Sequence, residues 1–599
     1  MAMTVPERLA ALRQKMEEAG VDAYLVPTDD FHGSEYVGDF FKCRKYITGF
    51  TGSAGTALIM RDMAGLWTDG RYFLQAEQQL AGSGVSLFRM REEGVPTMEE
   101  FLSQKMEEGM TLGFDGRTVT AVNGRKYEAL LAKNHAAIRC DLDLVGEIWP
   151  DRPALSAEPV WLLDEKYAGE SAASKIRRVR EAMAAREADH FLLTSLDDIA
   201  WLLNIRGNDV ACNPVVLSYL LMDEKAVTLY ASLEAFSEPV RFALAEADIS
   251  LRPYLQIYED VKEIPGGSCV LLDPGKVNFA LRNLLPETVR IVEAENPTLM
   301  MKACKNPVES AHMANAHVKD GVAVTRYIHW LKTHVGKEEI TELSAADKLE
   351  EFRRDGADYL GPSFDPIIAY KEHAAIMHYS ATEETSVPVL AEGMLLTDSG
   401  GQYLDGTTDI TRTIVLGKVS EKEKEFFTRV LRGHLNLASA HFLYGCSGIN
   451  FDYLAREPLW EIGEDFNHGT GHGVGFVLNV HEGPNSFHYR SYPGRKPETV
   501  MEEGMVTSNE PGYYLPGQFG IRHENLVICK KAEKQPCGQF MRFESLTLVP
   551  FDLDGVIPEM MSDKEKQRLN EYHRRVYETI GPLVPADVRD WLREATREI

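Results

Sequence analysis

Two segments of the chain follow the same order of helix, short apolar strand and acidic turn. They are RQKMEEAGVDAYLVPTDD at residues 13–30 and REAMAAREADHFLLTSLDD at residues 180–198. Three pairs match at one constant spacing, namely Met16 with Met183, Asp22 with Asp189 and Leu25 with Leu192. A shared pattern buries a shared core, so it predicts two related α/β domains, with chance similarity of one helix–strand unit as the alternative.

Proline-rich polar stretches at residues 150–159 and 296–307 are typical of linkers. A chain of 599 residues is also too long for one hydrophobic core. These breaks predict domains at 1–155, 156–305 and 306–599, in a fold of the α/β (α+β) class. The third domain opens with a helical pattern and ends, from Ser562 onward, with two charged helices.

The first twenty residues predict a capped amphipathic helix rather than a signal peptide. Thr4 is the expected N-cap, Glu7 completes a capping box, Pro6 lies in the first turn and Gly20 ends the helix. The sequence has no run of 18 apolar residues, so we expect no membrane-spanning segment. A formal net charge of −27 argues against nucleic acid and anionic membranes as partners.

The chain contains eight cysteines and no CxxC pair. In a protein of this size, scattered cysteines are typical of reduced thiols and predict a cytoplasmic location, with a disulfide left open.

Five short signatures in the third domain each carry one residue suited to binding a metal ion. These residues are Asp398 in LLTDSGGQY, Asp409 in DGTTDITRT, His472 in HGTGHGVG, Glu510 in NEPGYY and Glu524 in GIRHEN. Four carboxylates with one imidazole suit Mn²⁺ or Mg²⁺, and zinc accepts the same ligands. Two carboxylates about 4 Å apart repel by roughly 4 kcal/mol at an effective dielectric constant near 20. Two divalent ions would neutralise the four negative charges.

The signatures with the aspartates and with His472 also have other interpretations. Asp398 and Asp409 lie on adjacent strand-like runs joined by the hairpin signal Asp405-Gly406. Turn aspartates often accept backbone N–H groups instead; we favour that interpretation for Asp405, and for Asp398 taken alone it stays open. The glycines around His472 predict a close approach of the backbone to a ligand. A phosphate cradle is the rival, but the segment matches neither GxGxxG nor GxxxxGK[ST].

Arg522 is expected on the same strand face as Glu524, because side chains alternate, and there it would orient a ligand carboxylate. His523 would point the other way, as an ordinary packed or exposed histidine. The zinc-protease signature HExxH and the serine-nucleophile signature GxSxG are absent. Trp201 and Tyr219 lie in apolar runs and are expected in the core.

These signatures, together with TGSAGTA, WTDGRYFLQA, LDDIAWLLNIRGNDV, LNVHEGP and FESLTLVP, resemble the three-domain aminopeptidase P family of pita-bread metallopeptidases over essentially the full length. The resemblance implies two creatinase-like N-terminal domains followed by a pita-bread catalytic domain. It implies hydrolysis of an N-terminal X-Pro bond by a hydroxide that bridges two divalent ions per subunit, most simply Mn²⁺, with Zn²⁺ or Co²⁺ possible. It also implies a homodimer that acts on peptides with proline in second position.

The same resemblance assigns roles to single residues. Asp398 would bind one ion, His472 and Glu510 the other, and Asp409 and Glu524 would bridge them. Glu510 would carry the proton, His378 and His481 would contact the substrate during catalysis, and His468 and Arg71 would help to bind it.

Three departures from the family pattern stand out. The segment AYKEHAAIMHYS before His378 replaces a Gly-Pro-Asn type loop, Asn509 stands where relatives often carry aspartate, and His523 replaces an aliphatic residue. An X-Pro dipeptidase or a methionine aminopeptidase would use the same ligands, although the three-domain length argues against both. From another class, the alternative is a peptidase-like binding protein without activity.

Overall fold

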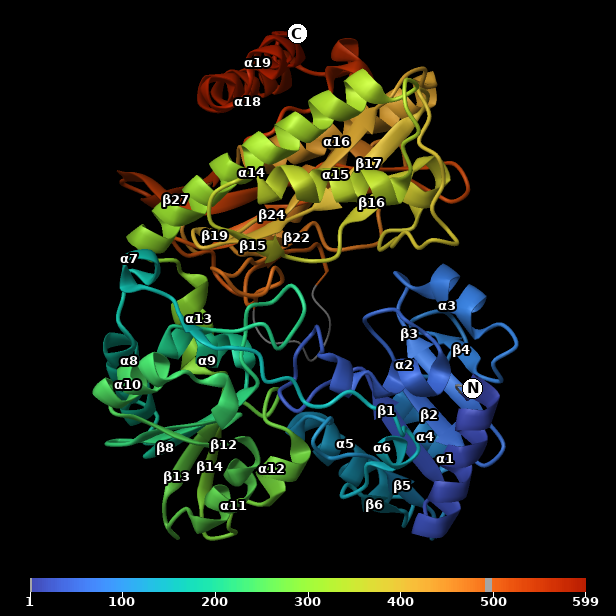
Figure 1. Ribbon diagram of the computed structural model, residues 1–599, viewed down its shortest axis with the longest axis vertical. Coiled ribbons are helices and arrows are strands. Elements are labelled where there is room, and N and C mark those ends of the chain that lie inside the picture. The colour runs from blue at the N-terminus through green and yellow to red at the C-terminus, as the bar shows by residue number, and fades with distance from the viewer. Residues whose placement is uncertain (1–2, 491–497) are drawn as a thin grey trace. The chain divides into compact units, whose positions relative to one another are not determined.

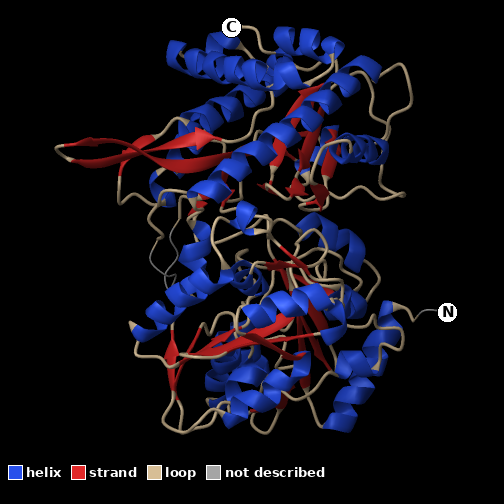
Figure 2. Ribbon diagram, turned by 60° about the vertical axis from the view of Figure 1, so that its left-hand side comes forward, coloured by secondary structure: helices blue, strands red, loops and turns tan. Residues whose placement is uncertain are grey.

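The computed structural model describes residues 3–490 and 498–599, which form two compact units. The N-terminal unit comprises Met1–Leu163 and Glu170–Thr298, and the C-terminal unit comprises Asp164–Gly169 and Leu299–Ile599. Both units contain helices packed on sheets, as Figures 1 and 2 show. Within the described ranges, no helix combines the length and the apolar character needed to cross a membrane.

The N-terminal unit contains two six-stranded sheets. The first has the order β4–β3–β2–β1–β5–β6, with bounds β1 Ala23–Pro27, β2 Thr56–Met60, β3 Ala64–Thr68, β4 Ser86–Arg89, β5 Thr111–Gly113 and β6 Ala137–Arg139. The second has the order β12–β11–β10–β8–β13–β14, with bounds β8 His190–Leu193, β10 Ser218–Asp223, β11 Val227–Ala231, β12 Ile249–Pro253, β13 Cys269–Leu272 and β14 Arg290–Glu293. Two short strands, β7 Trp161–Leu162 and β9 Ile205–Arg206, pair with each other.

Helices cover these sheets. They are α1 Val5–Ala19, α2 Cys43–Thr48, α3 Phe73–Leu80, α4 Met98–Lys105, α5 Ala121–Ala132 and α6 Leu144–Glu147, then α8 Ala172–Ala184, α9 Leu196–Leu203, α10 Glu238–Glu246, α11 Ile257–Asp260 and α12 Phe279–Asn283. The helix predicted at the N-terminus is confirmed as α1. The Glu7 carboxylate accepts hydrogen bonds from the Thr4 backbone N–H at 2.7 Å and from its hydroxyl at 2.8 Å. Gly20 ends the helix at φ +68°, a left-handed conformation that favours glycine.

The internal repeat extends to the topology of the two sheets. In each sheet a central strand, β1 or β8, pairs antiparallel with the next strand of the same sheet, β2 or β10, and parallel with the strand on its other side, β5 or β13. The matched aspartates also have the same role. Asp22 accepts from the Thr111 backbone N–H and Asp189 from the Cys269 backbone N–H, both at 2.9 Å, so each ties its central strand to the parallel neighbour.

One aromatic side chain joins the two halves of the N-terminal unit. Phe279, at the start of α12 in the second half, is fully buried in the hydrophobic core of the first. Its ring lies against Gly124 of α5, where a Cβ atom would approach it to 2.2 Å. The backbone N–H groups of Phe279 and Ala280 donate to the carbonyls of Val119 and Gly116. The halves therefore share a core and form one unit.

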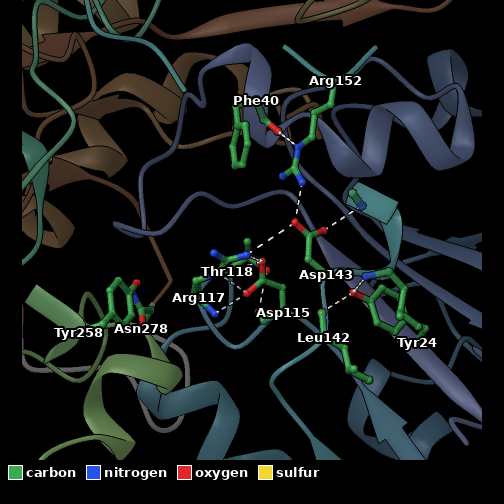
Figure 3. Close-up of polar contacts among 12 residues, drawn as sticks. Tyr24, Phe40, Asp115, Arg117, Thr118, Leu142, Asp143, Arg152, Tyr258 and Asn278 are labelled. Carbon is green, nitrogen blue, oxygen red and sulfur yellow. Dashed lines mark hydrogen bonds and ion pairs between the residues drawn. The ribbon is translucent and has the colours of Figure 1, made fainter. Parts of the chain in front are cut away.

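A polar layer lies beside this junction (Figure 3). Arg117 pairs with Asp115 at 2.8 Å, and Arg152 pairs with Asp143 at 2.6 Å. Asn278 donates to the Tyr258 hydroxyl at 3.2 Å. These contacts satisfy polar groups that the junction removes from water.

The two predicted linkers differ in structure. No helix or strand lies between α6 and β7, which agrees with the linker predicted at residues 150–159. The second predicted linker, at residues 296–307, contains the boundary between the two compact units, at Thr298 and Leu299, and also a helix, α13 Pro297–Ala303. Its Lys302 and the following Lys305 are buried beside Glu482, and this packing orders the segment.

In the part of the chain that the structure describes, the C-terminal unit has seven further α-helices. They are α7 Glu165–Ala168, α14 Pro307–His334, α15 Glu342–Arg354, α16 Glu421–Ala438, α17 Asp452–Trp460, α18 Asp563–Ile580 and α19 Ala586–Ala595. The opening helix and the two charged helices after Ser562 are therefore confirmed. Asn306 caps α14 by accepting from the backbone N–H groups of Val308 and Glu309, each at 2.9 Å.

Its strands form several small sheets. They are β15–β18–β19 (Tyr359–Pro362, Gly401–Tyr403, Gly406–Thr407), β16–β17–β20 (Ile367–Tyr370, Met394–Ser399, Ile410–Val415), β21–β28–β27–β24 (His441–Leu443, Gly538–Ser545, Asn525–Gln535, Val506–Asn509), β22–β23 (Gly471–His472, Ser486–Phe487) and β25–β26 (Gly512–Leu515, Phe519–Arg522). Helix α15 packs on β16, while α16 packs on β24, β25 and β26. The strands between these helices carry the site described next.

Candidate metal centre

Asp398 and Asp409 come together on a β-hairpin, as predicted. Strand β17 pairs antiparallel with β20, with Asp398 opposite Thr411, and Asp409 directly precedes β20. The tip of the hairpin is formed by β18 and β19 around Asp405. The carboxylate of Asp405 contacts side chains of α14 rather than the backbone N–H groups that we expected. Its partners are His312 at 2.8 Å, Asn315 at 2.7 Å and the Lys319 ammonium.

A buried ion pair stabilises this hairpin through hydrogen bonds to its side chains. Asp320 of α14 and Arg353 of α15 are almost fully buried and pair at 2.7 Å. Asp320 accepts from the hydroxyl of Thr408 at 2.6 Å, and Arg353 donates to the hydroxyl of Ser399 at 3.1 Å. Thr408 precedes Asp409 and Ser399 follows Asp398. The pair therefore holds the backbone next to both aspartates.

The glycines around His472 let backbone segments pack against each other. A Cβ atom at Gly471 would lie 1.8 Å from the Ser508 carbonyl oxygen, and one at Gly473 would lie 2.0 Å from that of Glu482. We expected these glycines to let a ligand approach the backbone. In the structure they instead let two backbone segments pack closely against each other. Gly471 and His472 form strand β22, paired with β23.

The imidazole of His472 is oriented by its own backbone neighbour. Its Nδ1 lies 3.0 Å from the Gly473 carbonyl oxygen, which can only accept, so Nδ1 carries the proton and Nε2 faces the carboxylates. Nε2 lies 3.5 Å from Asp409 Oδ2 and 3.4 Å from Glu510 Oε1. This arrangement leaves the nitrogen that a metal ion would use among acidic groups.

Glu510 and Glu524 are each held by a neighbouring hydroxyl. Glu510 follows β24, and its Oε1 accepts from the Ser508 hydroxyl at 3.0 Å. Glu524 was predicted within one continuous strand, but β26 ends at Arg522 and β27 begins at Asn525. The interruption lets the Glu524 backbone N–H donate to the Thr411 carbonyl, while the Thr411 hydroxyl donates to Glu524 Oε2 at 2.6 Å.

The arrangement fits metal binding. Asp409, His472 and Glu524 each offer a ligand atom, and these three atoms lie within 4.8 Å of one another. One oxygen of Asp398 and one of Glu524 are buried and have no hydrogen-bond partner among the described residues. Orphaned carboxylate oxygens of this kind are costly unless a cation or a proton satisfies them.

The electrostatics of the cluster lead to the same conclusion. Burial raises the pKa of Asp398 to about 6 even though the positive Arg522 opposes it, and Asp409 adds to the rise. Burial and the charges of Asp409 and Glu510 raise the pKa of Glu524 well above its usual value. Burial alone would lower the pKa of His472, but Asp409 and Glu510 outweigh it and raise the pKa to about 9. The cluster therefore holds protons wherever cations do not neutralise it.

Arg522 connects the cluster to the predicted substrate side. It donates to Asp398 Oδ2 at 2.5 Å and to the Tyr514 hydroxyl at 2.8 Å. Tyr514 lies 2.9 Å from Nε2 of His468, whose Nδ1 contacts the Gly469 carbonyl oxygen. The tyrosine hydroxyl therefore donates to His468. Burial and then the charge of Arg522 lower the pKa of His468 to about 3, so the imidazole is neutral.

Of the remaining predicted residues, His481 lies next to the cluster. Its ring centroid is 4.2 Å from that of His472. His378 lies three residues after the end of a short 3-10 helix, Lys371–Ala375, of the same unit. Arg71 lies in the N-terminal unit, where it makes two bonds with Asp69, each at 2.8 Å. Its contact with a substrate stays a prediction.

The core positions of Trp201 and Tyr219 were predicted correctly, whereas the backbone conformation of the loop before His378 was not predicted. Trp201 and Tyr219 are buried, and His523 packs against Phe427 with ring centroids 4.3 Å apart. The segment before His378, noted above as a departure, contains Lys371 at φ +50°, a conformation that suits glycine.

A buried carboxylate anchors this segment. Glu342 of α15 accepts from the Tyr370 backbone N–H at 2.8 Å, from His373 Nδ1 at 2.9 Å and from the Tyr379 hydroxyl at 2.9 Å. Tyr379 directly follows His378, so Glu342 fixes the segment on both sides of this histidine.

Sequence reasoning missed three residues that hold the cluster and one that holds the segment around His378. They are Thr411, Ser508, Tyr514 and Glu342. The first three lie inside or directly beside the signatures and could have been found there, since polar side chains next to ligands often orient them. Glu342 had no local signal.

Family models match nearly the whole chain. Residues 8–143 and 151–309 match Creatinase/Prolidase N-terminal domains, residues 311–531 match metallopeptidase family M24, and residues 539–599 match the C-terminal region of peptidase M24.

Named relatives are similar over the full length. The chain is 38% identical to Aminopeptidase P2 of Arabidopsis thaliana, over 100% of this chain and 89% of that protein. It is 37% identical to Xaa-Pro aminopeptidase 1 of Dictyostelium discoideum, over 97% and 94%. Among solved structures, X-prolyl aminopeptidase from Caenorhabditis elegans, described as a cytosolic enzyme with a di-nuclear active site, covers 100% of both chains at 34% identity and a TM-score of 0.94. The chain belongs to the three-domain aminopeptidase P family of the M24 metallopeptidases.

Proposed function

We propose that this protein is a metal-dependent aminopeptidase that hydrolyses the N-terminal X-Pro bond of peptides with proline in second position. The observation that carries this proposal is the convergence of Asp409, His472 and Glu524 within 4.8 Å in a chain that resembles X-Pro aminopeptidases from end to end.

Two divalent ions per subunit would occupy the cluster, with Mn²⁺ as the first candidate and Zn²⁺ or Co²⁺ as others. Asp398 would hold one ion, His472 and Glu510 the other, and Asp409 and Glu524 would bridge them. The orphaned oxygens of Asp398 and Glu524 support this assignment. When bound, the ions supply Lewis acidity, which activates a water molecule and polarises the scissile carbonyl group.

The side chains around the cluster would perform the remaining steps. Glu510 would take a proton from the attacking water and pass it to the proline nitrogen, which has no N–H of its own. His481 and His378 would donate hydrogen bonds that position the substrate and stabilise the developing oxyanion. His468 and Arg71 would bind the substrate, and Arg522 would keep Asp398 in place.

Cleavage assays with matched peptides test this function. We expect release of the first residue from an X-Pro-containing pentapeptide, loss of activity after chelation, and recovery with Mn²⁺. Glu510→Ala should lose about 10²–10³ in kcat or more, whereas Glu503→Ala, at an exposed carboxylate of the same unit, should match wild type.

The alternatives give different outcomes. Cleavage of an X-Pro dipeptide without cleavage of the pentapeptide would indicate an X-Pro dipeptidase. Metal binding without any cleavage would indicate an inactive binding protein.

The remaining properties are proposals of the same kind. We propose domains at 1–155, 156–305 and 306–599, a homodimer, a cytoplasmic location, and no nucleic-acid or membrane partner. The matched ranges of the family models support the boundaries, and the cytosolic description of the Caenorhabditis elegans enzyme supports the location. Light scattering after gel filtration tests the dimer.

A further inference from the structure

The segment that carries His481 adopts a strained backbone. Residues 474–482, named the His481 loop below, lie between strands β22 and β23. Within the loop, Val477 has φ +51° and is fully buried. A β-branched residue rarely adopts this left-handed conformation, and it persists only where surrounding contacts hold it. The loop must therefore be clamped from outside.

One clamp comes from the tip of the metal-site hairpin. The Leu478 carbonyl oxygen accepts from the side-chain amide of Gln402 at 2.8 Å and from the Thr407 hydroxyl at 3.2 Å. These bonds fix the middle of the loop directly after the strained residue.

The second clamp is a buried ion pair at the end of the loop. Glu482 is 2% exposed, and its Oε1 lies 2.6 Å from Nζ of Lys305, which is 1% exposed. The Lys302 ammonium lies 3.4 Å from Oε2 of the same carboxylate. Lys305 is itself fixed, because its backbone N–H donates to the Gly504 carbonyl at 3.1 Å. Buried charges cannot exchange their partners for water, so this pair is a rigid anchor.

The Lys305–Glu482 ion pair is linked to the metal centre through one backbone carbonyl group. The Glu482 backbone N–H donates to the Gly473 carbonyl oxygen at 2.7 Å, and the same oxygen lies 3.0 Å from His472 Nδ1. A displacement of Glu482 would therefore disturb the tautomer and orientation of His472. It would also shift His481, the residue directly before it.

We propose that the Lys305–Glu482 ion pair positions both histidines by holding the His481 loop in its strained conformation. Lys305 and Glu482 are thus positioning residues, which act through His481 and His472 and do not touch the substrate. This inference rests on the proposed peptidase function.

Substitutions that change one property at a time test the inference. Lys305→Met removes the positive charge at similar length, and Lys305→Arg keeps it. The double variant K305M/E482Q removes both charges of the pair, leaves the charge of Lys302, and serves as the second test if the single variant does not fold. Lys332→Met is the matched control, because Lys332 pairs with the largely buried Asp552 at 2.5 Å and with the exposed Asp554 at 2.7 Å, and neither belongs to the loop.

We expect Lys305→Met and the double variant to lower kcat and kcat/KM together by at least tenfold on an X-Pro pentapeptide, with KM little changed. This is the signature of an interaction that matters in the transition state. Lys305→Arg should recover part of kcat, and Lys332→Met should retain all of it. The visible absorption spectrum of the Co²⁺-loaded protein should change in Lys305→Met and the double variant, because it reports the geometry of His472.

Wild-type kcat together with an unchanged Co²⁺ spectrum in the folded double variant would overturn the inference. A wild-type protein that cleaves no X-Pro peptide would contradict the proposed function instead, and the Co²⁺ spectra would still decide whether the ion pair positions His472.

Discussion

The buried Asp320–Arg353 ion pair next to the metal-site hairpin predicts measurable effects on stability and on metal affinity. Arg353→Met would leave the fully buried Asp320 carboxylate with two neutral donors, Tyr403 at 3.1 Å and Thr408 at 2.6 Å, in place of the guanidinium. Breaking a buried ion pair by removing one partner typically costs about 3–5 kcal/mol. Residues that orient metal ligands typically change metal affinity by about 10–100-fold, so we expect weaker binding of Mn²⁺ as well.

Two measurements on one protein preparation check this prediction. Urea unfolding reports the loss of stability, and titration calorimetry of the chelator-stripped protein reports the affinity for Mn²⁺. Arg326→Met is the control, since Arg326 pairs with Asp355 at the surface, where such pairs contribute only about 0–1 kcal/mol.

A double variant separates the two effects. Replacing Asp320 with leucine as well as Arg353 with methionine should restore much of the stability, because no lone charge stays buried. It should still bind Mn²⁺ weakly, because the contacts to Thr408 and Ser399 are gone. A single Arg353→Met variant with the unfolding midpoint and the Mn²⁺ affinity of wild type would refute the reasoning.

Three further predictions concern pH and packing. Because folding raises the pKa values of Asp398, to about 6, and of Glu524, the metal-free protein should lose stability as pH rises through about 6. In thermal unfolding experiments, the protein in chelator should lose stability over this pH range, and the Mn²⁺-loaded protein should not. The same dependence of the melting temperature on pH in both samples would contradict the raised pKa values of Asp398 and Glu524. The bond to Glu342 raises the pKa of His373, so the stability that His373 contributes should be complete below pH about 6.5 and fall as pH rises further. A stability difference between wild type and His373→Asn that stays constant from pH 5.5 to 8.5 would exclude this linkage. Phe279→Ala should lower the stability of the N-terminal unit by about 3–5 kcal/mol, measured by urea unfolding, and an unchanged midpoint would show that the shared core is dispensable.

Local features of the fold followed from sequence because their partners are close in the chain. The Thr4–Glu7 capping box spans three residues, and the Asp405-Gly406 turn brings β17 and β20 together across a short hairpin. The repeat was detectable because both copies keep the same helix, strand and aspartate. Each aspartate in turn bonds to a strand that lies much later in the sequence.

Contacts between distant residues were not predictable in this way. Glu342 and His373 are 31 positions apart, and Lys305 and Glu482 are 177 apart. No local pattern marks either pair, and residues 296–307 resembled a linker for that reason. The glycines around His472 show the same limit, since composition alone does not distinguish packing against a ligand from packing against another strand.

The sequence by itself determined which side chains could bind metal ions, because carboxylate and imidazole chemistry and short-range turn signals are local properties. The tertiary structure decided which of those side chains meet, which nitrogen of His472 faces the carboxylates and which buried charges brace them. These outcomes depend on burial and on partners supplied by remote segments, and both arise only when the chain has packed.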